Sequence, residues 1–211
     1  MPPALLVIAK EPVPGRVKTR LTPPCTPAQA ARLARSAIED TLAATLAVDC
    51  DVRRIVVLDG EPGPWIPDGF EIVPQRGEGL AERLASAFAD AGAPAFLVGM
   101  DTPQVTPELL EAGLDALVEG DACFGAALDG GYWGIGLREA DPRVFDGVPM
   151  SEDNTGAVQR ARLAILGLLT AVLPPLRDID TIEDARAVAA AAPESRFAAV
   201  LSEIEPEVMA A

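Results

Sequence analysis

Short apolar runs alternate along this chain with longer segments of helical periodicity. Residues 4–9 form a continuous apolar run, which is typical of a strand buried on both faces. Further strands are expected at residues 54–58, 70–73, 95–100, 123–128, 133–137 and 170–173. Helices are expected at residues 26–47, 80–91, 106–118 and 155–167, and from about residues 181 and 193. This alternation predicts an α/β fold with a mostly parallel sheet.

Two helix starts carry capping-box patterns. Thr26 stands before Pro27 and is followed three residues later by Gln29. Thr181 and Asp184 repeat the spacing near the other end of the chain. Because no internal repeat or low-complexity linker interrupts the 211 residues, we expect residues 1–211 to form a single domain.

The charge of the chain limits its partners. The formal net charge is −15 and the isoelectric point is about 4.3. Neither nucleic acid nor an anionic membrane surface is therefore expected as a partner. No apolar run approaches the roughly 20 residues of a membrane span, and the N-terminus lacks a signal-peptide pattern. We expect a cytoplasmic protein, of an oligomeric state that the sequence leaves open.

The chain contains no histidine and three cysteines. Without histidine, Ser-His-Asp and Cys-His catalysis and imidazole-based zinc sites are excluded. Cys25, Cys50 and Cys123 have neither metal-ligand nor redox spacing and are expected to be buried thiols. Chemistry must therefore use carboxylates, lysine, arginine, tyrosine, hydroxyls or a hard metal ion.

One loop after the first expected strand contains both lysines of the chain, Lys10 and Lys18, together with Arg16 and Arg20. A lysine ammonium meets a phosphate as a point charge, and an arginine meets it as a planar fork. Gly15 allows the backbone of the loop to approach an anion closely. The loop therefore predicts an anion site, with a solvated basic turn as the alternative.

Acidic residues follow two of the expected strands. Asp101 comes directly after residues 95–100, where ligands of open α/β sheets bind. Mg²⁺ takes one or two carboxylates plus phosphate oxygens, which suits this position, whereas a carboxylate that caps the following turn is the alternative. Asp178 and Asp180 lie on one face if their segment is extended, or they cap the next helix.

A third candidate element is the sequence Asp129-Gly130-Gly131-Tyr132 between two expected strands. Its glycines let the backbone approach a ligand, and Tyr132 offers a stacking or hydrogen-bonding surface. A hairpin turn with an Asp-Gly corner is the alternative. Gln75 either reaches a bound base or phosphate or lines the entry of the next helix.

The elements occur in the order AKEPVPGRVKTRL, QRGEGLAERL, GMDTP, DGGYWGIGL and RDIDTIEDA. Over nearly its whole length the chain thereby resembles the bacterial radical-SAM/selenodomain-associated transferases, or DUF-type glycosyltransferase A proteins. More distantly it is similar to the phospholactate and molybdenum-cofactor guanylyltransferases. The resemblance implies a nucleotide-diphospho-sugar transferase (GT-A) fold, a three-layer α/β sandwich.

The resemblance also implies roles for single residues. The loop would hold nucleotide phosphates, Asp101 would bind Mg²⁺ or Mn²⁺ with Asp180 as the second carboxylate, and residues 129–132 would form the acceptor side. Lys18, Arg20 and Asp101 are the expected catalytic residues. The expected substrate-binding residues are Lys10, Gly15, Arg16, Gln75, Arg83, Asp129, Gly130, Gly131 and Tyr132.

The expected reaction is nucleotidyl transfer, in which a small anionic acceptor attacks the α-phosphate of a nucleoside triphosphate and pyrophosphate leaves. An ionised acceptor needs no general base, so the lack of histidine is no obstacle. Glycosyl transfer from a nucleotide sugar is the alternative, although Asp101-Thr102-Pro103 supplies one carboxylate where a D-x-D motif has two. A non-catalytic nucleotide-binding module is a third hypothesis.

The chain departs from the family pattern at one place. Relatives often carry Trp-Ser-Thr after the hairpin, where this chain has residues 150–155. The sequence therefore does not identify the acceptor.

Overall fold

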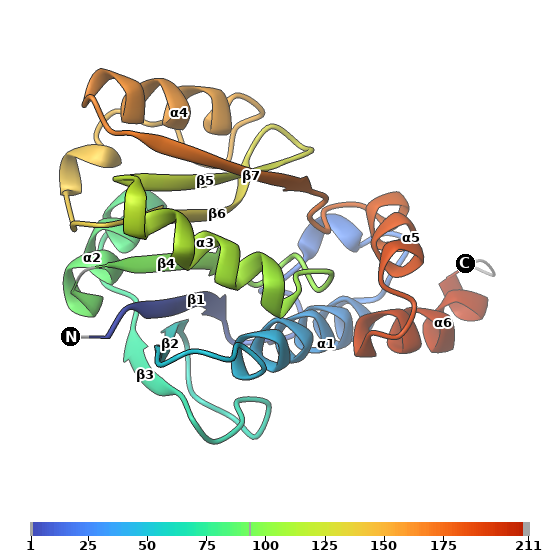
Figure 1. The fold of residues 1–211 in the computed structure, drawn as a ribbon. Coiled ribbons are helices and arrows are strands. Elements are labelled where there is room, and N and C mark those ends of the chain that lie inside the picture. Colours follow the sequence, from blue (N-terminus) through green and yellow to red (C-terminus); the bar gives the residue numbers. More distant parts are fainter. Residues whose placement is uncertain (1, 93, 209–211) are drawn as a thin grey trace.

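The computed structural model describes residues 2–92 and 94–208. In this part of the chain seven strands form one sheet in the order β3-β2-β1-β4-β6-β5-β7 (Figure 1). The strands are β1 (Ala4–Lys10), β2 (Arg53–Asp59), β3 (Glu71–Pro74), β4 (Ala95–Gly99), β5 (Ala122–Ala127), β6 (Tyr132–Leu137) and β7 (Thr170–Leu176). Only β6 runs antiparallel to its described neighbours, β4 and β5. The predicted α/β fold with a mostly parallel sheet is confirmed.

The helices begin where the sequence predicts them. They are α1 (Pro27–Leu46), α2 (Leu80–Ala91), α3 (Pro107–Glu119), α4 (Thr155–Ile165), α5 (Ile182–Ala191) and α6 (Arg196–Val208), with short 3-10 turns at Thr19–Leu21 and Pro142–Val144. Both capping boxes form, at Thr26 with Gln29 and at Thr181 with Asp184. The predicted ends are therefore correct to within a few residues, as expected of local signals.

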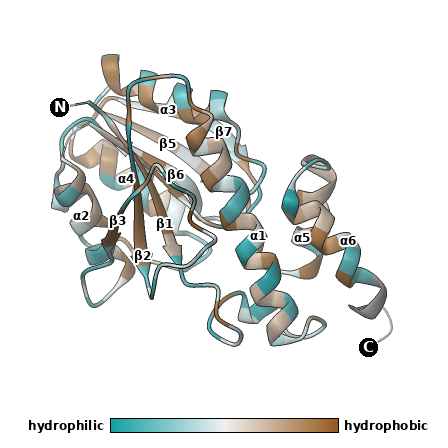
Figure 2. Ribbon diagram, turned by 90° about the horizontal axis from the view of Figure 1, so that it is seen from below, coloured by the Kyte–Doolittle hydropathy of each residue, from teal (hydrophilic) through white to brown (hydrophobic). Residues whose placement is uncertain are grey.

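Alternate residues of the strands face two helical layers. In β1, Leu5 and Val7 pack with α1 and α3, whereas Ala4 and Leu6 pack with α2 and α4. Figure 2 shows the hydrophobic strands between these helices. A strand covered on both faces must be apolar at every position, which explains the continuous apolar runs of the sequence.

Helix α6 packs against α1 on the side away from the sheet, and α5 packs against α6 (Figures 1 and 2). The buried cluster between them includes Leu21, from the end of the basic loop, and Ile179, from the segment after β7. Asp40 of α1 accepts hydrogen bonds from the backbone N–H groups of Arg196 and Phe197 at 3.1 and 2.8 Å, which satisfies the start of α6. This cluster holds the basic loop and the segment after β7 side by side.

One prediction about the cysteines is wrong. Cys25 and Cys123 are buried, and burial raises the pKa of the Cys123 thiol to about 12, but Cys50 is exposed. Cys50 follows α1 in the turn that leads to β2.

None of the helices in the described part of the chain combines the length and the apolar character that crossing a bilayer requires. The extent of the single domain stays a prediction.

The cap of α1 gives a first test. Thr26 Oγ1 accepts a hydrogen bond from the Gln29 N–H at 3.2 Å, and Gln29 Oε1 accepts one from the Thr26 N–H at 2.7 Å. We expect Thr26→Ala to lower the free energy of unfolding by about 1 kcal/mol and the melting temperature by about 2–4 °C. Thermal melts followed by circular dichroism measure this. Ser202→Ala on the exposed face of α6 is the control, and equal melting temperatures of the two variants would contradict the cap.

Candidate active site

The main candidate site is a pocket at the point where the strand order of the sheet reverses. Strand β1 is flanked by β2 on one side and β4 on the other, so the loops that leave the carboxyl ends of β1 and β4 diverge. Such a switch point is where open α/β sheets bind ligands. A cavity of about 470 Å³ opens there. Its lining includes residues 10 and 16–20 of the basic loop (residues 10–20), residues 99–101, 131–133 and 150–152, and Asp129, Thr155 and Asp180.

The basic loop lines one side of the pocket. In the described part of the chain, the side chains of Lys10 and Arg16 form no ion pair within 4.0 Å, and both residues are exposed. Gly15 has a φ of 77° and supports a turn in which the Arg16 N–H donates to the Val13 carbonyl at 3.0 Å. Two unpaired cations at the mouth of a pocket are suited to phosphate binding.

Lys18 does not point freely into the pocket. Its side chain is only 7% exposed, and its ammonium lies 3.0 Å from Asp101 Oδ2 and 4.0 Å from Asp180 Oδ1. It also donates a hydrogen bond to the Ile179 carbonyl. Its φ of 48° is unusual for a residue with a side chain. The structure thus places Lys18 between Asp101 and Asp180. The family resemblance implies a phosphate-binding role for Lys18 and pairs the two carboxylates as metal ligands.

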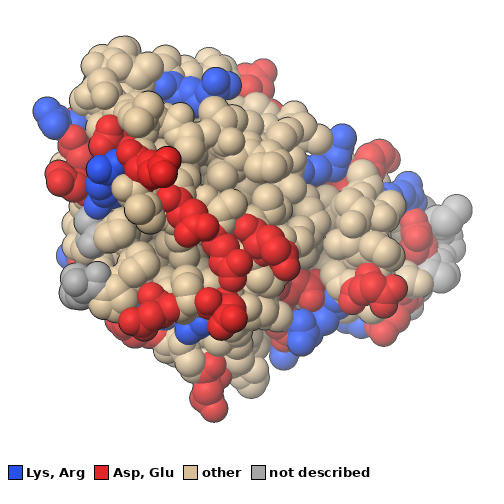
Figure 3. Space-filling view, in the orientation of Figure 1, with Lys and Arg blue, Asp and Glu red and all other residues tan. Residues whose placement is uncertain are grey.

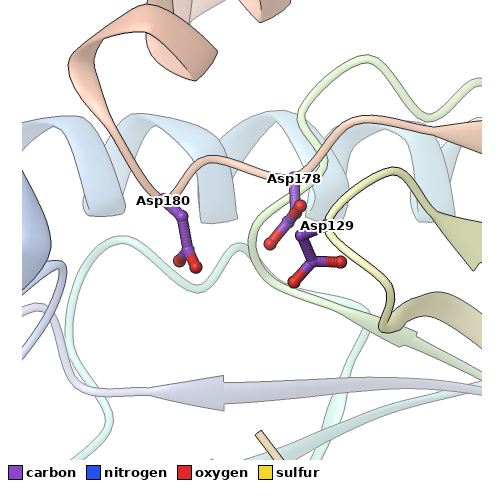
Figure 4. A group of neighbouring side chains, drawn as sticks. All are labelled: Asp129, Asp178 and Asp180. Atoms are coloured by element: carbon purple, nitrogen blue, oxygen red, sulfur yellow. The ribbon is translucent and has the colours of Figure 1, made fainter. Parts of the chain in front are cut away.

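Three carboxylates gather beside this lysine (Figure 4). Oxygen atoms of Asp129, Asp178 and Asp180 lie within 4.8 Å of one another. Asp129 comes from the turn between β5 and β6, and the other two come from the segment after β7. Burial and the nearby carboxylates of Asp129 and Asp180 raise the pKa of Asp178 to about 6, against the opposite influence of Lys18. Among the described residues, only Lys18 and Arg20 lie close to these carboxylates with positive charge, so negative charge is in excess at the cluster.

The donor set fits a hard divalent cation. Carboxylate oxygens are the ligands that Mg²⁺ prefers, and three residues supply them within a short distance. Asp101 Oδ1 is buried and has no hydrogen-bond partner among the described residues. A cation near Asp101 or the cluster would supply the missing charge.

The other side of the pocket is formed by two segments in close contact, residues 129–132 and 149–155. We call them the acceptor wall, after the role that the resemblance implies for residues 129–132. The Asp129 side chain accepts a hydrogen bond from the Gly131 N–H at 2.8 Å, and the Gly156 N–H donates to the Gly130 carbonyl at 2.7 Å. The turn is thus a hairpin turn, as one hypothesis held, and it also borders the pocket. The partly buried Tyr132 ring packs on Phe124 with centroids 5.4 Å apart.

Gln75 and Arg83 are tied to the protein itself. The Gln75 amide donates to the carbonyls of Ala9 and Val57 at 2.8 and 3.1 Å, and its oxygen accepts from Arg83 at 3.2 Å. Arg83 also pairs with Asp59 at 2.9 Å. Gln75 borders the pocket, whereas Arg83, Gly15 and Gly130 do not line it. Gln75 and Arg83 thus fix the ends of β1 and β2 beside the pocket.

The acidic excess lies largely outside the pocket. Figure 3 shows a diagonal row of acidic side chains over α3. This helix carries Glu108, Glu111, Asp115 and Glu119 at helical spacing on its outer side. The four basic residues that line the pocket all come from the basic loop, so positive charge at the pocket is confined to one side.

Sequence patterns do not predict two features at the pocket. They place Asp178 only on a shared face with Asp180, and they mark residues 150–155 only as a departure from relatives. The alternation of Asp178 and Asp180 was a usable signal for the first. The segment 150–155 lies far in sequence from the basic loop, and no local pattern indicates that both border one cavity.

Comparison with known families identifies the chain. A family model described as an uncharacterized protein conserved in bacteria (DUF2064) matches residues 30–152, more than half of the sequence. The chain belongs to the DUF2064 family. The matched range contains Asp101 and Asp129 but neither the basic loop nor Asp180. No curated protein matches the chain in sequence.

Solved structures place this DUF2064 protein in the nucleotide-diphospho-sugar transferase fold. A Desulfovibrio desulfuricans G20 protein, provisionally named a nucleotide-diphospho-sugar transferase, is 29% identical over 99% of this chain and 98% of its own, with a TM-score of 0.86. A cytidylyltransferase from Leptospira borgpetersenii is 14% identical over 99% and 96% of the two chains, with a TM-score of 0.60. A CMP-2-keto-3-deoxy-manno-octonic acid synthetase in complex with CTP is 13% identical over 90% and 99%, with a TM-score of 0.54. Two of these three proteins are named as transferases and the third as a synthetase.

Proposed function

We propose that this DUF2064 protein is a metal-dependent nucleotidyltransferase that moves a nucleotidyl group from a nucleoside triphosphate to a small acceptor and releases pyrophosphate. The observation that carries the proposal is one pocket at the switch point of the sheet that brings unpaired cations of the basic loop together with a carboxylate cluster. Phosphoryl-type transfer depends mainly on positioning and charge neutralisation, which these groups provide. The narrower resemblance to radical-SAM/selenodomain-associated transferases stays a prediction.

The basic loop would bind the triphosphate. Lys10 and Arg16 are exposed at the pocket and free of ion pairs within the described residues, so their charges are available to phosphate oxygens. Arg20 contacts Asp180 and is 68% exposed, so it can contact phosphate while it orients the carboxylate. Lys18, which is buried between Asp101 and Asp180, would hold these two carboxylates in place.

The carboxylates would bind a Mg²⁺ or Mn²⁺ ion. Asp129, Asp178 and Asp180 form the closest set of oxygen donors, and Asp101 is the carboxylate next to them across Lys18. When bound, the ion would neutralise charge on the phosphates and on the leaving pyrophosphate. This set extends the pair Asp101 and Asp180 that the family resemblance implies.

In the transfer step, an acceptor oxygen forms a bond to the α-phosphorus and the bond from that phosphorus to the bridging oxygen breaks. An acceptor that arrives as a hydroxyl would give its proton to a carboxylate of the pocket, for which Asp129 is placed. The electron pair leaves with pyrophosphate, whose charge Lys10, Arg16 and Arg20 would stabilise. The rigid wall of residues 129–132 and 149–155 would orient the acceptor for in-line attack.

Glycosyl transfer from a nucleotide sugar is the second candidate function. Carboxylates such as Asp129 at a pocket also suit the hydroxyls of a donor sugar, and the name of the 29% identical Desulfovibrio protein favours this reaction. Pyrophosphate release from triphosphates, measured with a panel of acceptors, supports nucleotidyl transfer. Release of nucleoside diphosphate from nucleotide sugars supports glycosyl transfer instead, and binding without either product supports a non-catalytic module.

Nucleotide binding can be tested before any acceptor is known. A ligand at 100 times its dissociation constant stabilises the native state by about 2.7 kcal/mol. For a chain of this size that corresponds to a rise in melting temperature of about 5–10 °C. We expect this rise with a nucleoside triphosphate and Mg²⁺, tested first with GTP and CTP, and we expect EDTA to remove most of it. If neither triphosphates nor nucleotide sugars change the melting temperature in saturating Mg²⁺, the nucleotide proposal fails.

A further inference from the structure

The charges of the acceptor wall are all negative. Asp129 and Glu152 are its charged residues that line the pocket, and all four basic lining residues lie in the basic loop. The remaining lining groups of the wall are uncharged: Gly131, Tyr132, Met150, Ser151 and Thr155. An incoming acceptor therefore meets carboxylates, hydroxyls and apolar side chains on this side.

A bound cation would not reverse the charge of this wall. Lys18 and Arg20 already contact Asp101 and Asp180. With one divalent cation added, these positive charges balance the carboxylates of the cluster and of Asp101, and Glu152 remains unbalanced. A triphosphate would also bring more negative charge than Lys10 and Arg16 carry. An acceptor with its own negative charge would thus enter a site of like charge.

Hydrogen bonds also hold the acceptor wall rigidly. The wall therefore cannot rearrange to place a basic side chain from elsewhere in the protein beside the acceptor. Thr155 Oγ1 donates to the Pro149 carbonyl at 2.7 Å and accepts from the Glu152 N–H at 3.0 Å. The Gly156 N–H is bonded to the Gly130 carbonyl. These contacts fix the backbone that presents Glu152 and Asp129 to the pocket.

From these observations we infer that the acceptor is an uncharged, hydroxyl-bearing compound, and that Glu152 is a specificity residue that disfavours phosphorylated or carboxylated acceptors. The inference rests on the proposed function and revises the anionic acceptor expected from sequence. Carboxylate oxygens accept hydrogen bonds from hydroxyls, and Tyr132 and Met150 provide apolar contact for the carbon skeleton. A polyol or sugar combines both kinds of group.

The test compares matched probes that differ by one phosphate. Glycerol, erythritol and glucose are each titrated against their phosphate monoesters on the Mg²⁺-nucleotide-loaded protein and on the free protein, with ligand-observed NMR. In the wild type we expect each parent compound to bind about 10-fold more tightly than its ester. Glu152→Lys should shift this ratio towards the ester by about 10-fold, and Glu152→Gln by about 3-fold. Glu139→Lys, the same charge change on an exposed residue outside the pocket, should leave the ratio unchanged.

Three results would overturn the inference: tighter binding of the esters by the wild type, a ratio insensitive to Glu152→Lys, or no binding of any parent compound or ester. The nucleotide titration itself is recorded separately on the same samples. A protein that binds no nucleotide contradicts the proposed function, whereas a nucleotide-loaded protein that prefers the esters contradicts only the acceptor class.

Discussion

The Asp178→Asn variant is expected to be more stable than the wild type without metal and to lose about 100-fold or more of its transfer activity. Asp178 is partly buried beside Asp129 and Asp180, and its raised pKa reflects an unfavourable negative charge. The neutral amide has the same size and removes this repulsion. Because the site is partly open to solvent, we expect a gain of only about 1 kcal/mol, or about 2–4 °C in melting temperature.

Mg²⁺ binding and transfer activity should both decrease in Asp178→Asn, although its stability without metal rises. The variant replaces one of the carboxylates that would bind the cation by a neutral amide. The rise in melting temperature on adding Mg²⁺ should therefore be smaller than in the wild type. Circular dichroism melts with and without Mg²⁺, and transfer rates at saturating Mg²⁺, measure both effects. Asp68→Asn, an exposed carboxylate outside the pocket, is the control and should match the wild type. A destabilised Asp178→Asn that keeps the full Mg²⁺ response would show that the cluster is structural.

Gly130→Ala is expected to cause the largest loss of stability at the acceptor wall. A Cβ atom on Gly130 would overlap the backbone carbonyl of Asp153, and the residue has a φ of 96°. Neither backbone can yield without breaking the hydrogen bond from Gly156 to Gly130. We expect a loss of about 3 kcal/mol in the free energy of unfolding, and of about 6–12 °C in melting temperature.

Gly147→Ala is the matched control for this variant. Gly147 also has a positive φ, of 71°, but a Cβ there meets no atom within 4 Å. Its substitution should therefore cost only the strain of the left-handed backbone, about 1 kcal/mol. Urea unfolding of both variants measures the two losses in free energy of unfolding. Their difference gives the cost of the overlap with Asp153 apart from the cost of backbone strain. Equal losses in the two variants would show that residues 130 and 153 are not in rigid contact.

The elements of the fold could be predicted because their signals are local. The apolar run of β1 reports burial on both faces, and Thr26 and Thr181 mark helix starts through bonds to residues three positions away. The order of strands and helices then brings Lys10 and Asp101 to the same edge of a parallel sheet, since parallel strands end together. The sequence alone thus determined the fold class and the position of the pocket.

The arrangement of charges within the pocket depended on tertiary structure. Asp129 joins Asp178 and Asp180 only because the β5–β6 hairpin places β6 antiparallel between β4 and β5, a pairing that no local pattern specifies. Lys18 is buried between carboxylates because the cluster of α1, α5 and α6 holds Leu21 and Ile179 together across about 160 residues. Such contacts depend on packing between segments far apart in sequence, whereas residue types and spacing report only on near neighbours.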